Sequence, residues 1–143
     1  MFIGLNFGLT GEPVTVDRPA TGDPTEQLLA KDLDLQIPAE TASTSNLVFS
    51  LRRCVNAAAV DVEIDSASGL HVVSGVESPT ASDGTLVRNS DEQVTVHLAA
   101  NAFDHLKPGE YHLELHEITL GGRVIPKYTQ VLYLTRSASR RMS

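Results

Sequence analysis

Apolar and polar residues alternate along six segments of the chain between residues 33 and 135. In residues 60–64, for example, the valines and the isoleucine would share one face of a strand, while Asp61 and Glu63 would share the other. A period of two is that of a β-strand with one buried face. The alternation therefore predicts strands over residues 33–37, 47–53, 60–64, 93–99, 110–117 and 127–135, the last of which is apolar in both phases.

Turn signals lie between these segments. A Gly-Gly pair at 121–122 and an Asp-Gly pair at 83–84 predict tight hairpins, because such residues adopt the positive φ that suits strand twist. Residues 107–109 (KPG) predict a turn in which proline fixes φ, and residues 66–69 (SASG) predict a loop. In the second half of the chain, residues 99–106 alone have a helical pattern, and it is at most two turns long.

Six or seven short strands with frequent turns and almost no helix are typical of an all-β protein. Each alternating strand has one wet and one dry face, as in antiparallel sheets that stack in pairs. We therefore expect an antiparallel β-sandwich of two sheets. A small barrel is the alternative.

The first 46 residues differ in composition from the rest. They contain four of the seven prolines, and residues 10–32 and 38–46 do not fit the strand pattern. Ordinary domains rarely contain irregular loops of that length, so these segments are either disordered in isolation or laid across another protein. We expect an extended N-terminal arm with one or two short strands over residues 1–46, a sandwich domain over residues 47–136 and a basic tail over residues 137–143.

The apolar residues of this arm and the arginines near the C-terminus are the candidate contacts with partner proteins. An arm that orders on docking loses conformational entropy, which the burial of apolar side chains would offset. The stretch 136–143 carries three arginines and no acid, so it could contact an acidic neighbour. The candidate partner-binding residues are Phe2, Ile3, Leu5, Phe7, Leu28, Leu29, Arg136, Arg140 and Arg141.

Composition narrows the classes of function. The length of 143 residues, with 41% apolar and 20% charged residues, indicates one globular domain. A formal net charge of −7 makes nucleic acid an unexpected partner. A single cysteine excludes an internal disulfide, and no apolar run approaches the roughly 20 residues of a membrane-spanning helix. The apolar residues 1–9 lack the basic flank and cleavage site of a secretion signal, and we expect no membrane partner.

The segment HLELH, residues 112–116, contains residue types that bind metals. On a strand the two histidines would lie about 13 Å apart. That separation is too large for one ion with Zn–N distances near 2.0 Å. His112 and Glu114, with His97 from a neighbouring strand, could still hold an ion in a small metal-dependent enzyme. The favoured interpretation is a polar, outward-facing strand surface.

Other candidate chemistry is weaker. Cys54 follows Arg52 and Arg53, which would lower the pKa of its thiol, but no catalytic signature surrounds it. A strand-end cysteine that packs as a small apolar residue is the favoured interpretation. Acids spaced by two residues mark the solvent side of a strand, and no phosphate-loop, dinucleotide-binding, zinc-protease or nucleophile-elbow motif occurs. The sequence predicts no catalytic residue, no cofactor and no metal.

The order of motifs from residue 47 to residue 135 does resemble a known family. The chain runs LVFSLRR, VDVEI and SASGLHVV, then QVTVHLAANAFDHLKPGEYHLELHEI, GGRV and QVLYLT. This order resembles the small immunoglobulin-like β-sandwich domain of tailed-bacteriophage structural proteins, including baseplate "upper" proteins. The sharpest motif is L-x-P-G-x-Y at residues 106–111, which also occurs in other immunoglobulin-like domains, where a turn feeds a core strand and the tyrosine packs inward.

The resemblance implies an all-β, immunoglobulin-like antiparallel β-sandwich with an extended N-terminal arm. It also implies a non-enzymatic, multi-copy virion component that docks on other tail, baseplate or capsid proteins, as a homo-oligomer within a symmetric assembly. The negative charge favours the outer surface or tail of the particle over contact with packaged DNA, after synthesis in the host cytoplasm. The alternative is an adhesion module that binds host-surface glycans through residues 74–87 and 99–107, although aromatic residues make up only 5% of the chain.

Overall fold

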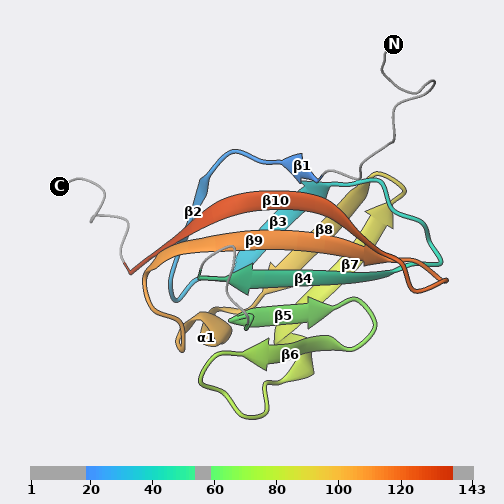
Figure 1. The fold of residues 1–143 in the computed structure, drawn as a ribbon. Helices are drawn as coiled ribbons and strands as arrows, with labels where there is room; N and C mark the ends of the chain where they lie inside the picture. Colours follow the sequence, from blue (N-terminus) through green and yellow to red (C-terminus); the bar gives the residue numbers. More distant parts are fainter. Residues whose placement is uncertain (1–18, 54–58, 137–143) are drawn as a thin grey trace.

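Two β-sheets stack face to face in the computed structural model of the protein (Figure 1). The structure describes residues 19–53 and 59–136. The larger sheet contains β1 (Ala20–Thr21), β2 (Thr25–Leu28), β4 (Asn46–Arg52), β5 (Val62–Asp65), β6 (Gly69–Val73), β9 (Gly109–Ile118) and β10 (Val124–Thr135). The smaller sheet contains β3 (Leu33–Pro38), β7 (Gly84–Ser90) and β8 (Gln93–Leu98).

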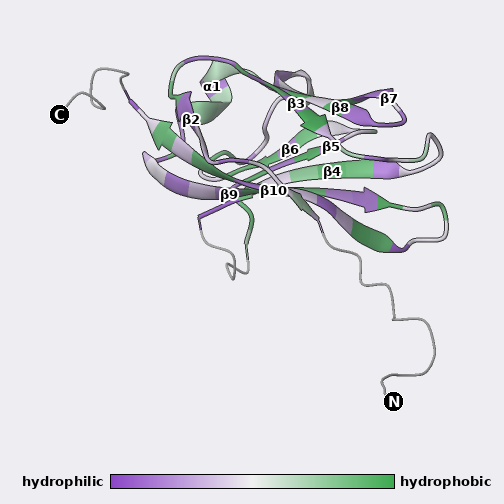
Figure 2. Ribbon diagram, turned by 90° about the horizontal axis from the view of Figure 1, so that it is seen from above, coloured by the Kyte–Doolittle hydropathy of each residue, from purple (hydrophilic) through white to green (hydrophobic). Residues whose placement is uncertain are grey.

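The strand order of each sheet defines the fold. The larger sheet runs β1-β10-β9-β4-β5-β6, with β2 also paired to β10, and the smaller sheet runs β3-β8-β7. Neighbours pair antiparallel, except that β1 and β2 run parallel to β10. Viewed along the sheets in Figure 2, the smaller sheet forms one layer and strands β4, β9 and β10 lie in the other.

This arrangement is that of a variable-type immunoglobulin domain. Strands β3, β8 and β7 take the places of strands B, E and D of that fold. Strands β10, β9 and β4 take the places of G, F and C, and β5 and β6 those of the additional strands C′ and C″. The predicted fold class, an immunoglobulin-like antiparallel sandwich, is therefore confirmed.

The core is built from the inward phase of the alternating strands. Phe49 on β4 and Leu113 on β9 are fully buried, at the places where antibody domains carry a tryptophan and the second cysteine of their disulfide. Each such side chain contributes roughly 1.5–3 kcal/mol by leaving water. Of the predicted inward residues, Leu35 and Val60 are only half-buried. The predicted inward residues that are buried are Leu33, Ile37, Leu47, Phe49, Leu51, Val62, Ile64, Val94, Val96, Leu98, Tyr111, Leu113 and Leu115.

A tyrosine corner joins the sheets at the start of β9. The Tyr111 ring is buried, and its hydroxyl donates to the backbone carbonyl of Lys107 at 2.9 Å. Arg53 covers the ring from outside, with its guanidinium 5.1 Å from the ring centre and its Nη1 donating to the hydroxyl at 3.2 Å. Gly109, with φ of +140°, completes the predicted turn. The inward tyrosine expected from the L-x-P-G-x-Y motif is confirmed.

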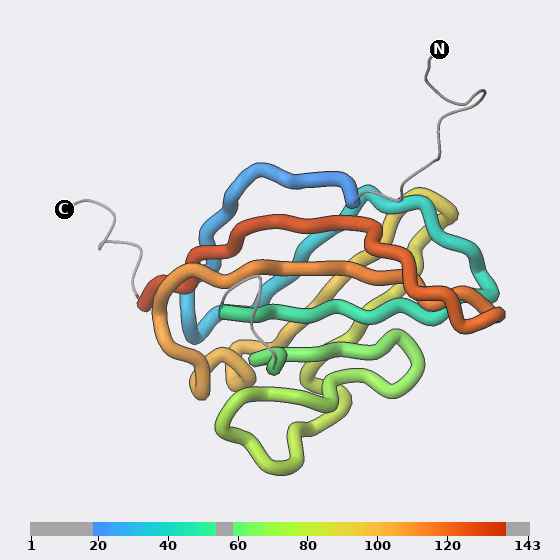
Figure 3. Tube along the Cα trace, in the orientation of Figure 1, coloured from blue at the N-terminus to red at the C-terminus, as the bar shows by residue number. Residues whose placement is uncertain are grey.

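The first described strands belong to the sandwich, which corrects the expected division after residue 46. Strand β3 pairs with β8 along its whole length, and β1 and β2 lie along β10 (Figure 3, blue beside red). Leu29 is 6% exposed and part of the core, so it is not the free docking contact that was predicted. The sequence conceals β1 and β2 because strands of two and four residues are too short to show an alternation. Residues 1–18 lie outside the described part of the chain.

Two buried glutamines hold these N-terminal strands in place. Gln130 Nε2 on β10 donates to the carbonyl of Asp23 at 2.7 Å, in the connection between β1 and β2. Gln27 Nε2 donates to the carbonyl of Lys31 at 2.8 Å, in the turn before β3. Tyr128 lies beside Gln130, and its burial, reinforced by the charge of Asp23, raises the pKa of its hydroxyl. These side chains satisfy backbone carbonyls that no strand ladder reaches.

The remaining turns and strands confirm some expectations and correct others. The predicted hairpin at 121–122 joins β9 to β10, with Gly122 at φ +89°, and α1 (Ala100–Phe103) is the predicted short helix. The hairpin expected at 83–84 is wrong. There the 3₁₀ helix η1 (Ala81–Asp83) leads into β7, and a Cβ at Gly84 would lie 3.0 Å from Ile64 and Leu70 across the core. Strand β10 is not covered on both faces, because Tyr133 is 42% exposed.

We expect Tyr111→Phe to lower the free energy of unfolding by about 1 kcal/mol, because it removes the hydroxyl that ties β9 to the preceding turn. Denaturant unfolding measures the change. The matched control is Tyr133→Phe, whose side chain lies on the outer surface, and we expect it to be near neutral. Equal midpoints for the two variants would contradict the structural role of the corner.

Candidate functional site

The larger sheet has an outer face that extends across strands β5, β4, β9 and β10. It faces away from β3, β7 and β8, and the register places its side chains in rows across the strands. One row joins Glu63, Ser50, Glu114 and Thr129. We define the outer face by Val48, Arg52, Glu63, Glu110, His112, Glu114, His116, Thr129, Val131 and Tyr133, which surround Ser50, itself only 2% exposed.

Charges on this face are arranged in pairs. Arg52 Nε lies 3.6 Å from Glu114 Oε1, and His112 Nε2 lies 3.4 Å from Glu110 Oε2. His71 Nε2 lies 2.6 Å from Glu63 Oε1 at the β6 edge. Partial burial is the largest single effect on the pKa of His71 and disfavours the charged imidazole. The hydrogen bonds to Glu63 and to the Gly69 carbonyl, with the charges of Glu63 and Asp65, together outweigh burial and raise the pKa. The face is therefore polar, and Arg52 with Glu114 is its ion pair between permanently charged side chains.

The structure separates the predicted metal-binding trio. His112 and Glu114 point outward from β9, whereas His97 lies on β8 in the other sheet. There His97 Nδ1 contacts Asp34 Oδ1 at 2.8 Å, with Asp32 Oδ2 at 3.8 Å from its Nε2. In residues 19–53 and 59–136, no three histidine, cysteine or acidic side chains are grouped as a metal ion would require. Cys54 lies outside the described residues.

Three of the nine predicted partner-binding residues lie in the described part of the chain. Leu28 is half-buried at the end of β2, and Arg136 is exposed directly after β10. Leu29 belongs to the core, as described above. The other predicted contacts lie outside the described residues: Phe2, Ile3, Leu5, Phe7, Arg140 and Arg141.

Glu117 is a buried carboxylate that was not among the residues predicted from the sequence. It continues the inward phase of β9 after Leu115 and is only 4% exposed. Its Oε2 accepts the backbone N–H of Ala42 at 2.8 Å, and its Oε1 lies 3.4 Å from Lys127 Nζ. It borders a polar cavity of about 530 Å³ together with Arg88. An acid in the buried phase of an alternating strand was the available signal.

Opposing effects set the pKa of Glu117. Burial disfavours the carboxylate and raises the pKa, but the Ala42 N–H, the Ser45 hydroxyl and the Lys127 ammonium together outweigh burial and lower it. The carboxylate therefore ties the β3–β4 connection to β9 and β10. This contact is a structural clamp at the end of the sandwich that carries the β9–β10 hairpin.

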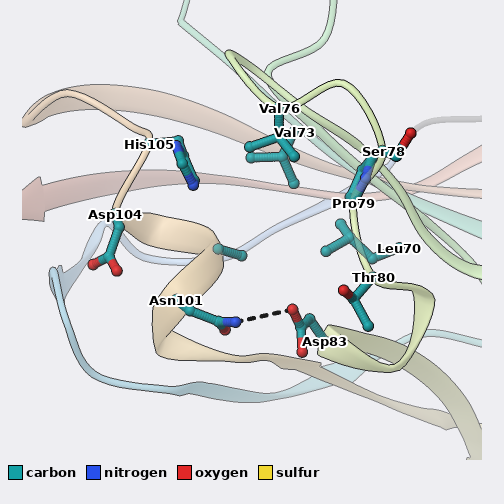
Figure 4. A pocket seen from close by; sticks show the side chains of 11 residues that line it. Leu70, Val73, Val76, Ser78, Pro79, Thr80, Asp83, Asn101, Asp104 and His105 are labelled. Carbon is teal, nitrogen blue, oxygen red and sulfur yellow. Dashed lines mark hydrogen bonds between the residues drawn. The ribbon is translucent and has the colours of Figure 1, made fainter.

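A cavity of about 240 Å³ lies at the opposite end of the sandwich, next to α1 (Figure 4). Leu70, Val73 and Val76 line one side, and Asn101 and His105 line the other. Asn101 Nδ2 donates to Asp83 Oδ2 at 3.0 Å and joins α1 to η1 beside the cavity. Residues from 74–87 and from 99–107, the segments named for the glycan-binding alternative, both line this cavity.

A second cavity, of about 300 Å³, adjoins the first. It is lined by Arg53, Asp61, Ser74, Leu106, Lys107 and Tyr111, and His105 lines both cavities. Two cations therefore face one carboxylate, and Asp61 Oδ2 already accepts the backbone N–H of Arg53 at 3.0 Å. The sequence offered no signal for this grouping, because its members come from four separate segments.

Comparisons with known proteins match no family model and no curated protein. Among solved structures, a chain from a study of T cell activation by the bacterial superantigen toxic shock syndrome toxin-1 is 6% identical, with a TM-score of 0.45. The match covers 82% of this chain and 94% of that chain. The ZIG-8–RIG-5 IG1–IG1 heterodimer is 10% identical, with a TM-score of 0.35, over 89% and 90%. The extracellular domain of the voltage-gated sodium channel beta4 subunit is 13% identical, with a TM-score of 0.35, over 89% and 99%. At these values the likenesses assign no function.

No helix within residues 19–53 and 59–136 combines the length and the apolar character that a membrane crossing needs.

Removal of the Glu117 carboxylate should be felt most at neutral pH. We expect Glu117→Gln to lower the free energy of unfolding by about 1–3 kcal/mol at pH 7, because it leaves the Ala42 N–H and Lys127 less well satisfied. The folded-state pKa is depressed, so the carboxylate stabilises fully above its unfolded pKa, near 4.5, and this stabilisation is lost as pH falls through the lower folded value.

Denaturant unfolding at a series of pH values measures this difference between the protein and its variant. The matched control is Glu110→Gln on the same strand, whose side chain is half-exposed on the outer face. A Glu117→Gln deficit that stays constant from pH 7 to pH 2.5 would contradict the clamp.

Proposed function

We propose that this protein is a non-enzymatic β-sandwich building block of a bacteriophage virion. It is present in many copies and docks on other tail, baseplate or capsid proteins through its sheet faces and its N-terminal residues. The outer face of the larger sheet is the observation that carries this proposal. It spans β5, β4, β9 and β10, Arg52 pairs with Glu114 on it, and Tyr133 adds an exposed aromatic ring, a residue type enriched in protein interfaces.

The tyrosine corner supports the sequence resemblance behind this proposal. The motif that most resembles the phage domains, L-x-P-G-x-Y, forms a turn that feeds a core strand, with Tyr111 packed inward. A similar turn is common to immunoglobulin-like domains, so it supports the class of fold more strongly than the virion. The assignment to a virion rests on the order of motifs over residues 47–135.

Further contacts would extend from the edges of the domain. The hairpin between β9 and β10 presents Leu120 and Val124, which are 84% and 58% exposed. Phe2, Ile3, Leu5 and Phe7 precede β1 in the sequence and would add apolar area on a neighbouring subunit. Arg136, Arg140 and Arg141 would contact acidic neighbours, because these arginines stand apart in a chain of net charge −7.

The net charge supports a role on the outside of the particle. A net charge of −7 repels packaged DNA, so the domain would occupy the outer surface or the tail after synthesis in the host cytoplasm. The partners would be proteins, with no cofactor required.

A second candidate function is a glycan-binding adhesion module. The observation that favours it is the 240 Å³ cavity, where the predicted binding loops meet and Ser78, Thr80 and Asn101 contribute polar groups. Its apolar side and the lack of a tryptophan in the chain disfavour a sugar, because sugars commonly stack on aromatic rings.

Incorporation into particles tests the virion proposal. Host cells that supply a tagged chain during infection should yield purified virions containing it, as quantified by mass spectrometry. We expect Val131→Arg on the outer face to reduce its incorporation at least tenfold, because a new charge opposes docking there. The matched control is Thr85→Arg on the smaller sheet, which we expect to reduce incorporation much less, because the outer face of the larger sheet is the main docking surface in this proposal.

Thermal unfolding of both variants separates a docking defect from misfolding. Antibody labelling of intact particles should reach the tag from outside. Purified virions that lack the wild-type chain would refute the proposed function.

A glycan array probed with the full chain tests the adhesion alternative. We expect no glycan to bind, because the cavity offers no aromatic platform. Saturable binding that is lost in Asn101→Ala, but kept in the outer-face variant Val131→Arg, would reverse the order of the two candidates.

A further inference from the structure

The two cavities at the α1 end form one composite feature, because His105 lines both of them. We call them the paired cavities. Their combined lining joins the β6–β7 connection, α1 and its following turn, and the start of β9. They differ in chemistry, and that difference restricts what they could hold together.

The first of the paired cavities has one apolar side, and its polar lining includes the carboxylates of Asp83 and Asp104. Leu70 and Val73 are core residues, yet they reach this cavity, and Val76 extends the same side (Figure 4). An apolar cavity of about 150 Å³ admits benzene. The 240 Å³ here is therefore enough for one aliphatic or aromatic side chain. Asn101 and His105 place polar atoms opposite the apolar side, where a peptide backbone would pass.

The second of the paired cavities is suited to an anion. Arg53 is held in place by the Tyr111 ring and hydroxyl, so little side-chain freedom remains to be lost on binding. Its guanidinium has five N–H donors, and the side-chain contacts within the described residues use one of them. Lys107 lines the same cavity and is exposed. Asp61 keeps its negative charge and accepts the backbone N–H of Arg53 with Oδ2, so Arg53 and Lys107 leave this cavity with one excess positive charge.

We propose that the paired cavities bind the carboxyl terminus of a partner polypeptide whose last residue is apolar. The last side chain enters the cavity of Leu70, Val73 and Val76, and the terminal carboxylate pairs with Arg53 and Lys107. An apolar C-terminal residue is the one place in a polypeptide where a single residue carries both an apolar side chain and a carboxylate. Capture of a terminal carboxylate is a recurring mode of peptide recognition.

This chemistry also argues against the other occupants. A glycan would place hydroxyl groups against the apolar side of the first cavity. A second copy of the chain docked through a flat sheet face would not enter either cavity. The inference deepens the proposed protein-docking role by naming one kind of partner. Its test does not depend on virions, because the binding of a free peptide can be measured with the purified protein.

Titration of the full chain with synthetic peptides tests the proposal. The probe is a hexapeptide that ends in leucine with a free carboxylate. It is compared with the same peptide as a terminal amide and with a version ending in serine. We expect the acid to bind and each comparator to bind about tenfold more weakly, the loss typical of one removed charged or apolar contact. Backbone amide NMR shifts should map to residues 70–80 and 101–107.

Variants of the chain identify the anion contact. Lys107→Gln should weaken the acid about tenfold and leave the amide unchanged. The matched control Arg123→Gln removes the same charge in the β9–β10 hairpin, at the opposite end of the sandwich, and should bind as the wild type does.

Absence of binding, equal affinity for acid and amide, or NMR shifts elsewhere would overturn the proposal. Octanoate that binds as tightly as the peptide would also overturn it, because a free amphiphile would then be the ligand. Any of these outcomes would leave incorporation into virions untouched, so the two proposals fail separately.

Discussion

The buried phase of β9 is the constraint on which the rest of the structure depends. β9 lies between β4 and β10, and its inward side chains run from Tyr111 through Leu113 and Leu115 to Glu117. The central leucines fill the core. The polar residues at both ends tie neighbouring connections to the sheet, through the Lys107 carbonyl at one end and the Ala42 N–H at the other. A single strand thus sets the spacing of the two sheets and anchors both ends of the sandwich.

Immunoglobulin-like domains without a disulfide need another means of holding their sheets together. Here Leu113 and Phe49 stand where antibody domains place a cysteine and a tryptophan, and both are fully buried. Apolar burial replaces the covalent link, and the polar contacts at the strand ends add directionality that burial alone does not supply. The glutamines Gln27 and Gln130 do the same for the N-terminal strands.

The outer surfaces of the sandwich offer two different modes of contact. The outer face of the larger sheet spans four strands and exposes Tyr133, which suits docking of one folded domain against another. The paired cavities at the α1 end are small and chemically divided, which suits a single chain terminus. An assembly protein with both could bind a neighbouring domain and a tethered peptide at once. Neither surface requires catalysis, which agrees with the building-block role proposed above.

The local pattern of the sequence determined the class of fold. Alternation in residues 47–53, 93–99 and 110–117 placed the core side chains correctly, because a period of two assigns each residue to one face of a strand whatever its partner. The turn at 107–109 and the hairpin at 121–122 followed from residues whose backbone freedom is intrinsic. Only the tertiary structure decided the rest. Parallel pairing of β1 and β2 with β10, and the meeting of Arg53, His105 and Lys107, join segments far apart in the chain. No local pattern encodes such meetings, since they depend on how the two sheets stack.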